Sequence, residues 1–171
     1  MIKRDITKRK LAGEALRESK GKYHTLANDV LDTSLVGMFI LDSDFRIAWA
    51  NRSIELYFGL QRDKVVGKDK RQLIQERIKD IFEGPESFTD KVLSTYDNNT
   101  YIENFECHVL PDGNRQERWL EHWSQPIRSG LYVEGRVEHY TDITKHKHTE
   151  HDLHERVKEL RCLYGIANIA D

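Results

Sequence analysis

The sequence predicts an α+β fold in which one antiparallel sheet carries short helices between its second and third strands. Two short apolar runs separated by the polar residues 42–44 predict a β-hairpin. From Asn51 the apolar residues change to a helical spacing, and beyond residue 101 they return to a spacing of two. Helical spacing also fills both ends of the chain, so we expect a helix on each side of the domain.

The first hairpin is expected over residues 38–41 and 47–50. Asn51 follows at the N-cap position of a helix, where its side-chain oxygen is expected to accept a free N–H of the first turn. Gly59 and Gly67 stand where short helices would end, because glycine adopts the left-handed conformation without steric cost. The spacing therefore predicts a strand–turn–strand–helix segment.

Strands are expected again in the last third of the domain, after a helical segment between residues 67 and 101. The predicted strands are 101–110, 117–127 and 131–142, joined by turns rich in Gly, Pro, Asn and Asp. Alternation over the first of them places Phe105, Cys107 and Val109 on the inward face. The total is five strands.

An ordered set of residues resembles the PAS sensory domains. It comprises Leu41, Asp42, Ile47, Asn51, Gly59 and Gly67, followed near the end by the strand Tyr140–Thr144 with its Asp142-Ile143-Thr144 sequence. The resemblance implies a PAS fold, which is a five-stranded antiparallel sheet with short helices on one face, flanked by N- and C-terminal signalling helices. It also implies a sensory function.

Three segments are predicted. Residues 1–32 form an N-terminal linker helix, 33–144 the PAS domain, and 145–171 a C-terminal, coiled-coil-like linker helix. The Asp-Ile-Thr-Lys sequence at 5–8 recurs at 142–145, which places the end of a preceding module at 5–8 unless the recurrence is due to chance. The resemblance implies a piece of a larger signalling protein, and we expect a sensor histidine kinase.

Composition excludes several classes of protein. The formal net charge is −2, so nothing draws the chain toward nucleic acid. No apolar run is long enough to span a membrane, and the charged N-terminus lacks the apolar segment of a signal peptide. Cys107 and Cys162 form no disulfide or zinc pattern. We therefore expect a cytoplasmic protein with reduced cysteines.

No catalytic pattern is found, so we expect no enzyme within this chain. Neither a glycine-rich phosphate loop nor a nucleophile elbow is present. Four histidines, His146, His148, His151 and His154, lie close together, and those three residues apart could share a metal on one helix face. Without a cysteine or a preformed cavity we expect that face to be solvated, and no metal site is predicted.

A ligand cavity is the stronger expectation. Alternation places Leu120, His122 and Ser124 on one face of their strand, and comparison with flavin-binding PAS relatives implies that this face and Tyr140 look inward. The further predicted lining residues are Phe39, Leu41, Ile54, Phe82, Val92 and Phe105. An apolar pocket with a few converging polar groups is typical of a ligand site. The alternative is a filled core in which His122 and Tyr140 bind each other or a buried water.

The cofactor stays unknown. The photoactive flavin relatives need a reactive cysteine after the second glycine, and residues 67–71 contain none. Haem-binding relatives often use a histidine on the long helix, but residues 86–98 contain none, and His122 would ligate iron only from the sheet in an unfamiliar geometry. The sequence therefore disfavours flavin photochemistry and haem.

The opposite face of the same strand predicts an interface. Trp119 and Trp123 would form an unusual exposed apolar patch, so we expect the N-terminal helix, through Tyr23, Leu26 and Val30, or a partner subunit to cover them. The resemblance implies a homodimer through this helix and sheet face, without nucleic acid or membrane contacts within the chain.

Two functions are consistent with these observations. In the first, a small ligand or a partner is sensed, and Asp142, Ile143 and Thr144 pass the change into the C-terminal helix. In the second, the domain is a dimerisation scaffold that binds no ligand.

Overall fold

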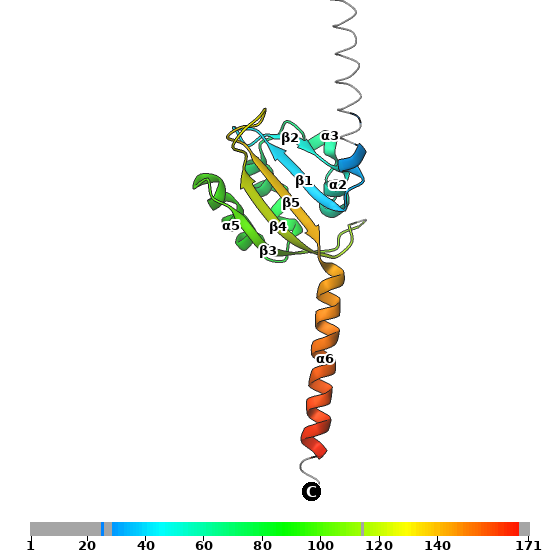
Figure 1. The fold of residues 1–171 in the computed structure, drawn as a ribbon. Helices are drawn as coiled ribbons and strands as arrows, with labels where there is room; N and C mark the ends of the chain where they lie inside the picture. The colour runs from blue at the N-terminus through cyan, green and yellow to red at the C-terminus, as the bar shows by residue number, and fades with distance from the viewer. Residues whose placement is uncertain (1–24, 26–28, 114, 168–171) are drawn as a thin grey trace, which may run out of the picture.

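The computed structural model describes residues 25, 29–113 and 115–167, and shows a single five-stranded antiparallel sheet in the order β2-β1-β5-β4-β3 (Figure 1). The strands are β1 (Val36–Leu41), β2 (Ile47–Ala50), β3 (Ile102–Val109), β4 (Arg118–Pro126) and β5 (Arg136–Asp142). The first strand pairs with the last at the centre of the sheet. The points where the chain enters and leaves the domain are thus coupled through backbone hydrogen bonds, and the predicted α+β fold is confirmed.

Short helices connect β2 to β3. They are α2 (Arg52–Phe58), α3 (Arg62–Val65), α4 (Lys70–Leu73), a π-helical turn (Ile74–Ile78), a 3-10 turn (Lys79–Ile81) and α5 (Pro85–Asp97). Gly59 ends α2 with a φ of 66°, which confirms the predicted stop. These helices lie on one face of the sheet, and Figure 1 looks onto the opposite face. Helix α6 (Thr144–Ala167) leaves from the end of β5 and extends away from the sheet.

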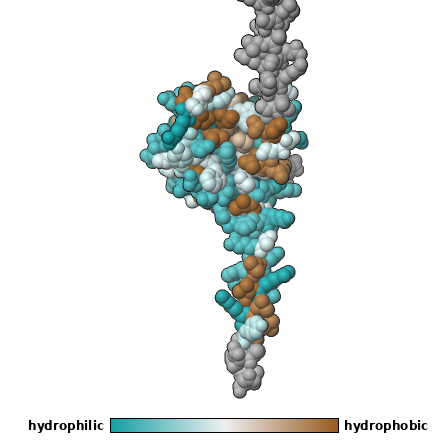
Figure 2. Space-filling view, in the orientation of Figure 1, coloured by the Kyte–Doolittle hydropathy of each residue, from teal (hydrophilic) through white to brown (hydrophobic). Residues whose placement is uncertain are grey.

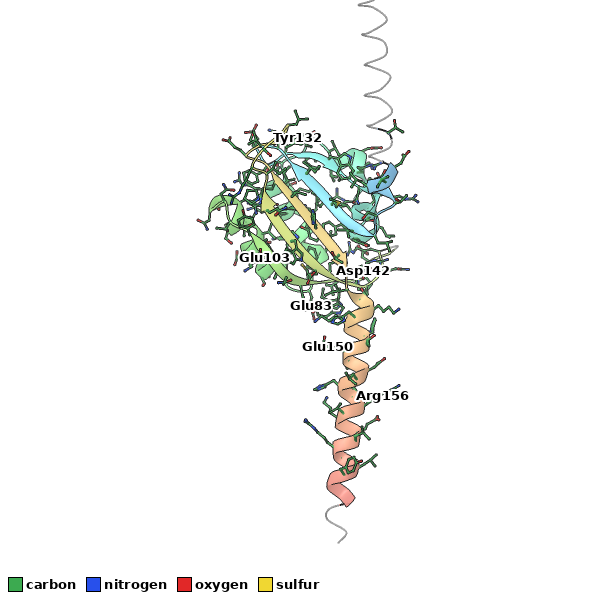
Figure 3. The ribbon with its side chains drawn as sticks, in the orientation of Figure 1. Glu83, Glu103, Tyr132, Asp142, Glu150 and Arg156 are labelled. Atoms are coloured by element: carbon green, nitrogen blue, oxygen red, sulfur yellow. The ribbon has the colours of Figure 1, made fainter. Side chains whose placement is uncertain are left out.

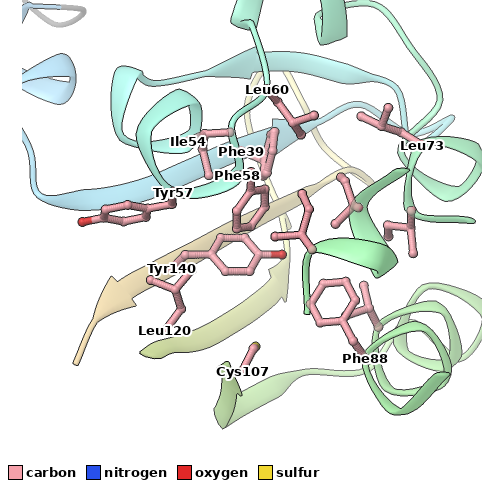
Figure 4. Packing of buried hydrophobic residues seen from close by; sticks show 14 of the residues in the cluster. Phe39, Ile54, Tyr57, Phe58, Leu60, Leu73, Phe88, Cys107, Leu120 and Tyr140 are labelled. Carbon is pink, nitrogen blue, oxygen red and sulfur yellow. The ribbon is translucent and has the colours of Figure 1, made fainter. Parts of the chain in front are cut away.

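The core lies between the sheet and the helices. Aromatic rings dominate its centre, where the ring of Phe58 lies 5.9 Å from that of Phe39 and 4.8 Å from that of Tyr140 (Figure 4). The Phe58–Tyr140 contact is edge-to-face, with planes 78° apart, and a contact of this kind adds about 0.5–1.5 kcal/mol to the gain from burying the rings. The helices are therefore held to the inward face of the central strands β1 and β5.

Asn51 occupies the N-cap position of α2 as predicted, but the expected side-chain hydrogen bond to the first turn of the helix is not made. Its Oδ1 accepts a hydrogen bond from the N–H of Met38 at 2.9 Å, and its Nδ2 donates to the carbonyls of Leu31 and Val36 at 3.0 and 2.7 Å. Asn51 is completely buried, so its amide satisfies backbone groups of β1 that water cannot reach. The side chain thereby joins the end of the N-terminal helix to the sheet.

The last strand is shorter than expected and begins at Arg136. Residues 131–135 form a turn in which Glu134 has a φ of 68° and donates a backbone hydrogen bond to Ile127 at 3.0 Å. Gly135 passes so close to β1 that a Cβ atom there would lie 2.0 Å from the carbonyl oxygen of Leu41. The backbone becomes extended only after this contact, from Arg136 onward. The strand is therefore shorter than the sequence predicted.

The predictions for the repeat at 5–8 and for Tyr23 and Leu26 lie outside the described residues. Among the helices that the structure does describe, none is long and apolar enough to cross a membrane.

Candidate functional site

The structure brings the ten predicted lining residues together between the sheet and the helices. Phe105 is partly buried and the other nine are buried: Phe39, Leu41, Ile54, Phe82, Val92, Leu120, His122, Ser124 and Tyr140. The expected inward direction of the β4 residues and of Tyr140 is confirmed, as is the inward face of Cys107 and Val109 on β3. A ligand-binding role for these side chains stays a prediction.

A buried carboxylate, Glu138 of β5, stands at the centre of this region. The hydroxyl of Tyr96 donates a hydrogen bond to its Oε1, and the hydroxyl of Tyr140 lies 3.4 Å from its Oε2. Burial alone would raise the pKa of Glu138, but the nearby ammonium of Lys70 leads the contributions that lower it overall. Glu138 is therefore a buried anion rather than a neutral acid.

Lys70 supplies the opposing charge from α4. Its Nζ lies 3.4 Å from Glu138 Oε2 and 3.3 Å from the centre of the Phe39 ring, where the electron-rich face attracts a cation. Beyond this ion pair, Nζ has no hydrogen-bond partner among the described residues. Burial lowers the pKa of Lys70 to about 8, against the effect of Glu138, which raises it.

His122 lies next to this pair on β4 and is completely buried. Its ring stacks on that of Tyr140, with centroids 4.2 Å apart and planes at an angle of 13°. The two rings therefore meet face to face and not through an edge-to-edge hydrogen bond. Nδ1 lies 3.1 Å from the backbone carbonyl of His139, which can only accept, so this nitrogen carries the proton. Burial lowers the pKa of His122 to about 4, and the ring is neutral near pH 7.

Arg136 completes the buried polar groups. Its guanidinium donates to Ser124 Oγ at 3.0 Å and to the carbonyls of Thr95 and Thr100 at 3.3 and 2.5 Å. Ser124 belongs to β4, Thr95 to the last turn of α5, and Thr100 to the segment that follows this helix, so the side chain fixes the helix to the sheet. Every polar residue described so far on the inward face of β5 thus contacts another structural element.

Four of these residues, Lys70, Tyr96, Arg136 and Glu138, were not predicted as part of the site. Placing Tyr140 inward also places Glu138 and Arg136 inward, because side chains two apart share one face of a strand. That signal was present in the sequence. Lys70 has no such signal, since it lies in the charged run 68–71 at the start of a short helix.

The predicted relay residues lie where β5 becomes α6 (Figure 3). Asp142 Oδ2 accepts a hydrogen bond from Arg118 of β4 at 2.5 Å, and Oδ1 accepts from the N–H of Thr144 at 3.0 Å. The backbone of Trp119 makes two further hydrogen bonds with this segment, both at 2.9 Å. The N–H of Trp119 donates to Thr144 Oγ1, and the carbonyl of Trp119 accepts from the N–H of Ile143. The start of α6 is therefore held to β4 by side chains and backbone together.

The outward face of β4 carries the predicted interface residues. Trp123 is 37% exposed and donates from Nε1 to Glu121 at 3.0 Å, and Val30 is 59% exposed. Trp119 is half-buried because His108 stacks on its ring at 4.4 Å and Lys147 of α6 lies 5.6 Å from its centre. Trp119 thus belongs to the junction with α6, while Trp123 faces solvent.

His108 binds two carboxylates at once. Nδ1 lies 2.9 Å from Glu83 and Nε2 lies 2.8 Å from Glu117. Burial alone would lower the pKa of His108, but the hydrogen bonds with these two carboxylates raise it overall. The imidazolium form is therefore favoured beside Trp119.

The histidines of α6, His146, His148, His151 and His154, are all exposed. Within residues 25, 29–113 and 115–167 there is no group of three or more His, Cys, Asp or Glu side chains that could hold a metal ion.

This sheet order, with helices on one face and a helix leaving the last strand, defines a small α+β module. The model of the PAS domain family matches residues 35–145, and the chain belongs to that family. PAS domains are signalling modules and are themselves non-catalytic. No curated protein matches the chain.

Solved structures share the fold. An RNA-binding light-oxygen-voltage receptor is 17% identical with a TM-score of 0.55, over 78% of this chain and 37% of that one, so this chain spans little more than a third of that receptor. The PAS domain of an HTR-like protein from Haloarcula marismortui is 16% identical with a TM-score of 0.52, over 76% of this chain and 99% of that one. Identities this low establish the fold alone.

Proposed function

We propose that this chain senses a small ligand or a partner through the buried polar groups and relays the change through β5 to α6. One observation carries the proposal. Glu138 and Tyr140 lie on the inward face of β5, and Asp142, which holds the start of α6, follows two residues later on the same strand.

The position of β5 in the sheet supports this relay. The strand pairs with β1 along one edge and with β4 along the other, so it is the central strand of the sheet. A change in the contacts of Glu138 therefore alters the strand that ends at Asp142. A relay of this kind requires an element with two arrangements, and the attachment of α6 to the sheet supplies a candidate.

The output is proposed to lie in the same polypeptide, in a two-component histidine kinase. Helix α6 exposes Leu153, Val157, Leu160 and Tyr164, spaced four, three and four residues apart, and Figure 2 shows apolar residues along this helix. That spacing favours a helix pair with a second copy of the chain. The N-terminal helix and the face around Trp123 are proposed to contribute to the same homodimer.

A ligand-free dimerisation scaffold is the second candidate function. The packing of the predicted lining residues into one buried cluster favours it, because a filled core needs no ligand. The two functions differ in whether a small molecule stabilises the fold.

The test is native mass spectrometry of the 171-residue chain as purified from cells, followed by thermal unfolding in a library of small metabolites. A bound small molecule, or a compound that raises Tm by several degrees, is expected for a sensor, because a ligand that binds only the native state stabilises it. A dimer without bound mass that no compound stabilises would overturn the sensory proposal and establish the scaffold.

A further inference from the structure

A pocket of about 260 Å³ opens between the start of α5 and β3. Its inner wall includes the rings of Phe82, Phe88 and Phe105. The Phe82 and Phe88 rings are stacked with centroids 4.1 Å apart, and the planes of Phe88 and Phe105 differ by only 26°. Nearly parallel rings of this kind present flat apolar surfaces, which suit a flat aromatic guest.

His122 does not line this pocket, but it pairs across the sheet with Phe105, which does. The ring centroids of His122 and Phe88 are 6.4 Å apart, and Phe88 extends from α5 toward the strands (Figure 4). Because Nδ1 of His122 donates to the His139 carbonyl, Nε2 at the tip of the ring is an acceptor. It is completely buried and has no hydrogen-bond partner among the described residues. A buried polar atom without a hydrogen-bond partner destabilises the fold, so a ligand that supplies the partner would be favoured at this atom.

We propose that a small flat aromatic molecule carrying a hydrogen-bond donor enters this pocket, displaces the Phe88 ring, and donates to Nε2 of His122. The inference rests on the proposed sensory function and names the chemistry of its ligand. The volume is slightly below that of ordinary ligand pockets and limits the guest to one or two rings.

The protonation state of His122 further restricts the ligand. Glu83 and Glu106 also line the pocket, but Glu83 is paired with His108 at 2.9 Å and Glu106 with Lys147 at 2.6 Å, so these carboxylates do not select the charge of the guest. Within the core, His122 is neutral and offers a lone pair rather than a proton. A hydrogen-bond donor such as a phenolic hydroxyl matches this lone pair.

The bound ligand would act on the relay through Tyr140, the neighbour of His122. The imidazole is stacked on Tyr140, which in turn contacts Glu138 on β5. Moving the imidazole toward a ligand therefore changes the packing of the strand that leads to α6.

The test compares phenol with fluorobenzene, which have nearly the same shape but differ in the donor. Affinities of the 171-residue chain are measured by titration in ¹H–¹⁵N NMR spectra, and the ¹⁵N shift of His122 Nε2 is followed at the same time. We expect phenol to bind about 10-fold more tightly, as one buried hydrogen bond would give. Phenol, and not fluorobenzene, is expected to move the Nε2 signal.

Two variants provide the controls. His122→Phe keeps a flat ring against Tyr140 but removes Nε2, so the preference for phenol should vanish. Trp123→Phe changes an aromatic residue on the opposite face of the sheet and should leave both affinities unchanged. The Nε2 shift of the wild-type chain tests the contact even where the His122 variant fails to fold.

Three results would overturn the inference. Equal binding of both probes, or an unmoved Nε2 signal, would exclude the hydrogen bond while leaving a sensory pocket in place. Binding of neither probe, together with stabilisation by some other metabolite, would exclude this class of ligand but not the proposed function. If no compound stabilises the chain, both proposals fail.

Discussion

The ammonium of Lys70 lies 3.4 Å from the carboxylate of Glu138, and both side chains are completely buried. The two residues belong to α4 and β5, so their ion pair joins the helical layer to the sheet. Removing two charges from water is costly, and the loss of one partner leaves the other charge uncompensated.

The Lys70→Met substitution is therefore expected to lower the free energy of unfolding by about 3–5 kcal/mol. Urea unfolding followed by circular dichroism measures the change. Lys68→Met, at an exposed neighbouring position, is the matched control and should stay within about 0.5 kcal/mol of the wild type. Adding Glu138→Gln to Lys70→Met should restore part of the loss, and an undiminished loss in the double variant would contradict the pairing.

The lowered pKa of His122 predicts that the chain loses stability in mild acid. Its pKa is about 4 in the folded chain, below the unfolded value of 6.5, so the unfolded state binds the extra proton first as pH falls. The stability due to the neutral ring is present above pH 6.5 and is lost between pH 6.5 and about 4, by roughly 3 kcal/mol. Urea midpoints across this range measure it, and the slope should be shallower in His122→Phe. An equal slope in both proteins would show that His122 titrates normally.

The raised pKa of His108 predicts the opposite dependence of stability on pH. Its pKa is raised overall, because Glu83 and Glu117 outweigh the effect of burial. The stability that this imidazolium contributes is present below pH 6.5 and is lost as pH rises through the folded-state pKa. NMR titration should give His108 a pKa above 6.5 that falls on Glu117→Gln substitution. A pKa that is unchanged in this variant would exclude the second carboxylate as a cause.

Asp142→Asn is expected to loosen the start of α6 without unfolding the sheet. The substitution removes the charge that binds Arg118 and weakens the acceptor for the N–H of Thr144, at a cost of about 1 kcal/mol. Hydrogen exchange over residues 144–150 should accelerate several-fold while β1 exchanges as before. Asp152→Asn, further along α6, is the control. Acceleration equal to that of the control would leave Asp142 without a role at this joint.

Trp123→Glu is expected to weaken the proposed homodimer at least 10-fold, because a charge would be buried at the centre of an apolar contact. Sedimentation equilibrium measures the dimer affinity. Leu131→Glu is a suitable control, since Leu131 is 87% exposed in the turn before β5. A dimer that tolerates the Trp123 substitution would place the interface on the helices alone.

Periodicity accounts for what could be predicted from the sequence. Strands expose alternate faces, so the inward positions of Leu120, His122 and Ser124 followed from spacing and a single reference point. The same rule applied to Tyr140 would have identified Glu138. A charged residue is ordinarily assigned to the surface, however, and a buried partner such as Lys70 from a distant helix becomes visible only in three dimensions.

The hydrogen bonds that hold Thr144 and Ile143 to Trp119 make α6 a lever arm with a fixed pivot. The helix is 24 residues long, or about 36 Å at 1.5 Å per residue. A tilt of only about 5° at the pivot displaces the far end by about 3 Å, more than half of the rise of one helical turn. A rearrangement too small to disturb the packing of the sheet is thus amplified with distance along the helix.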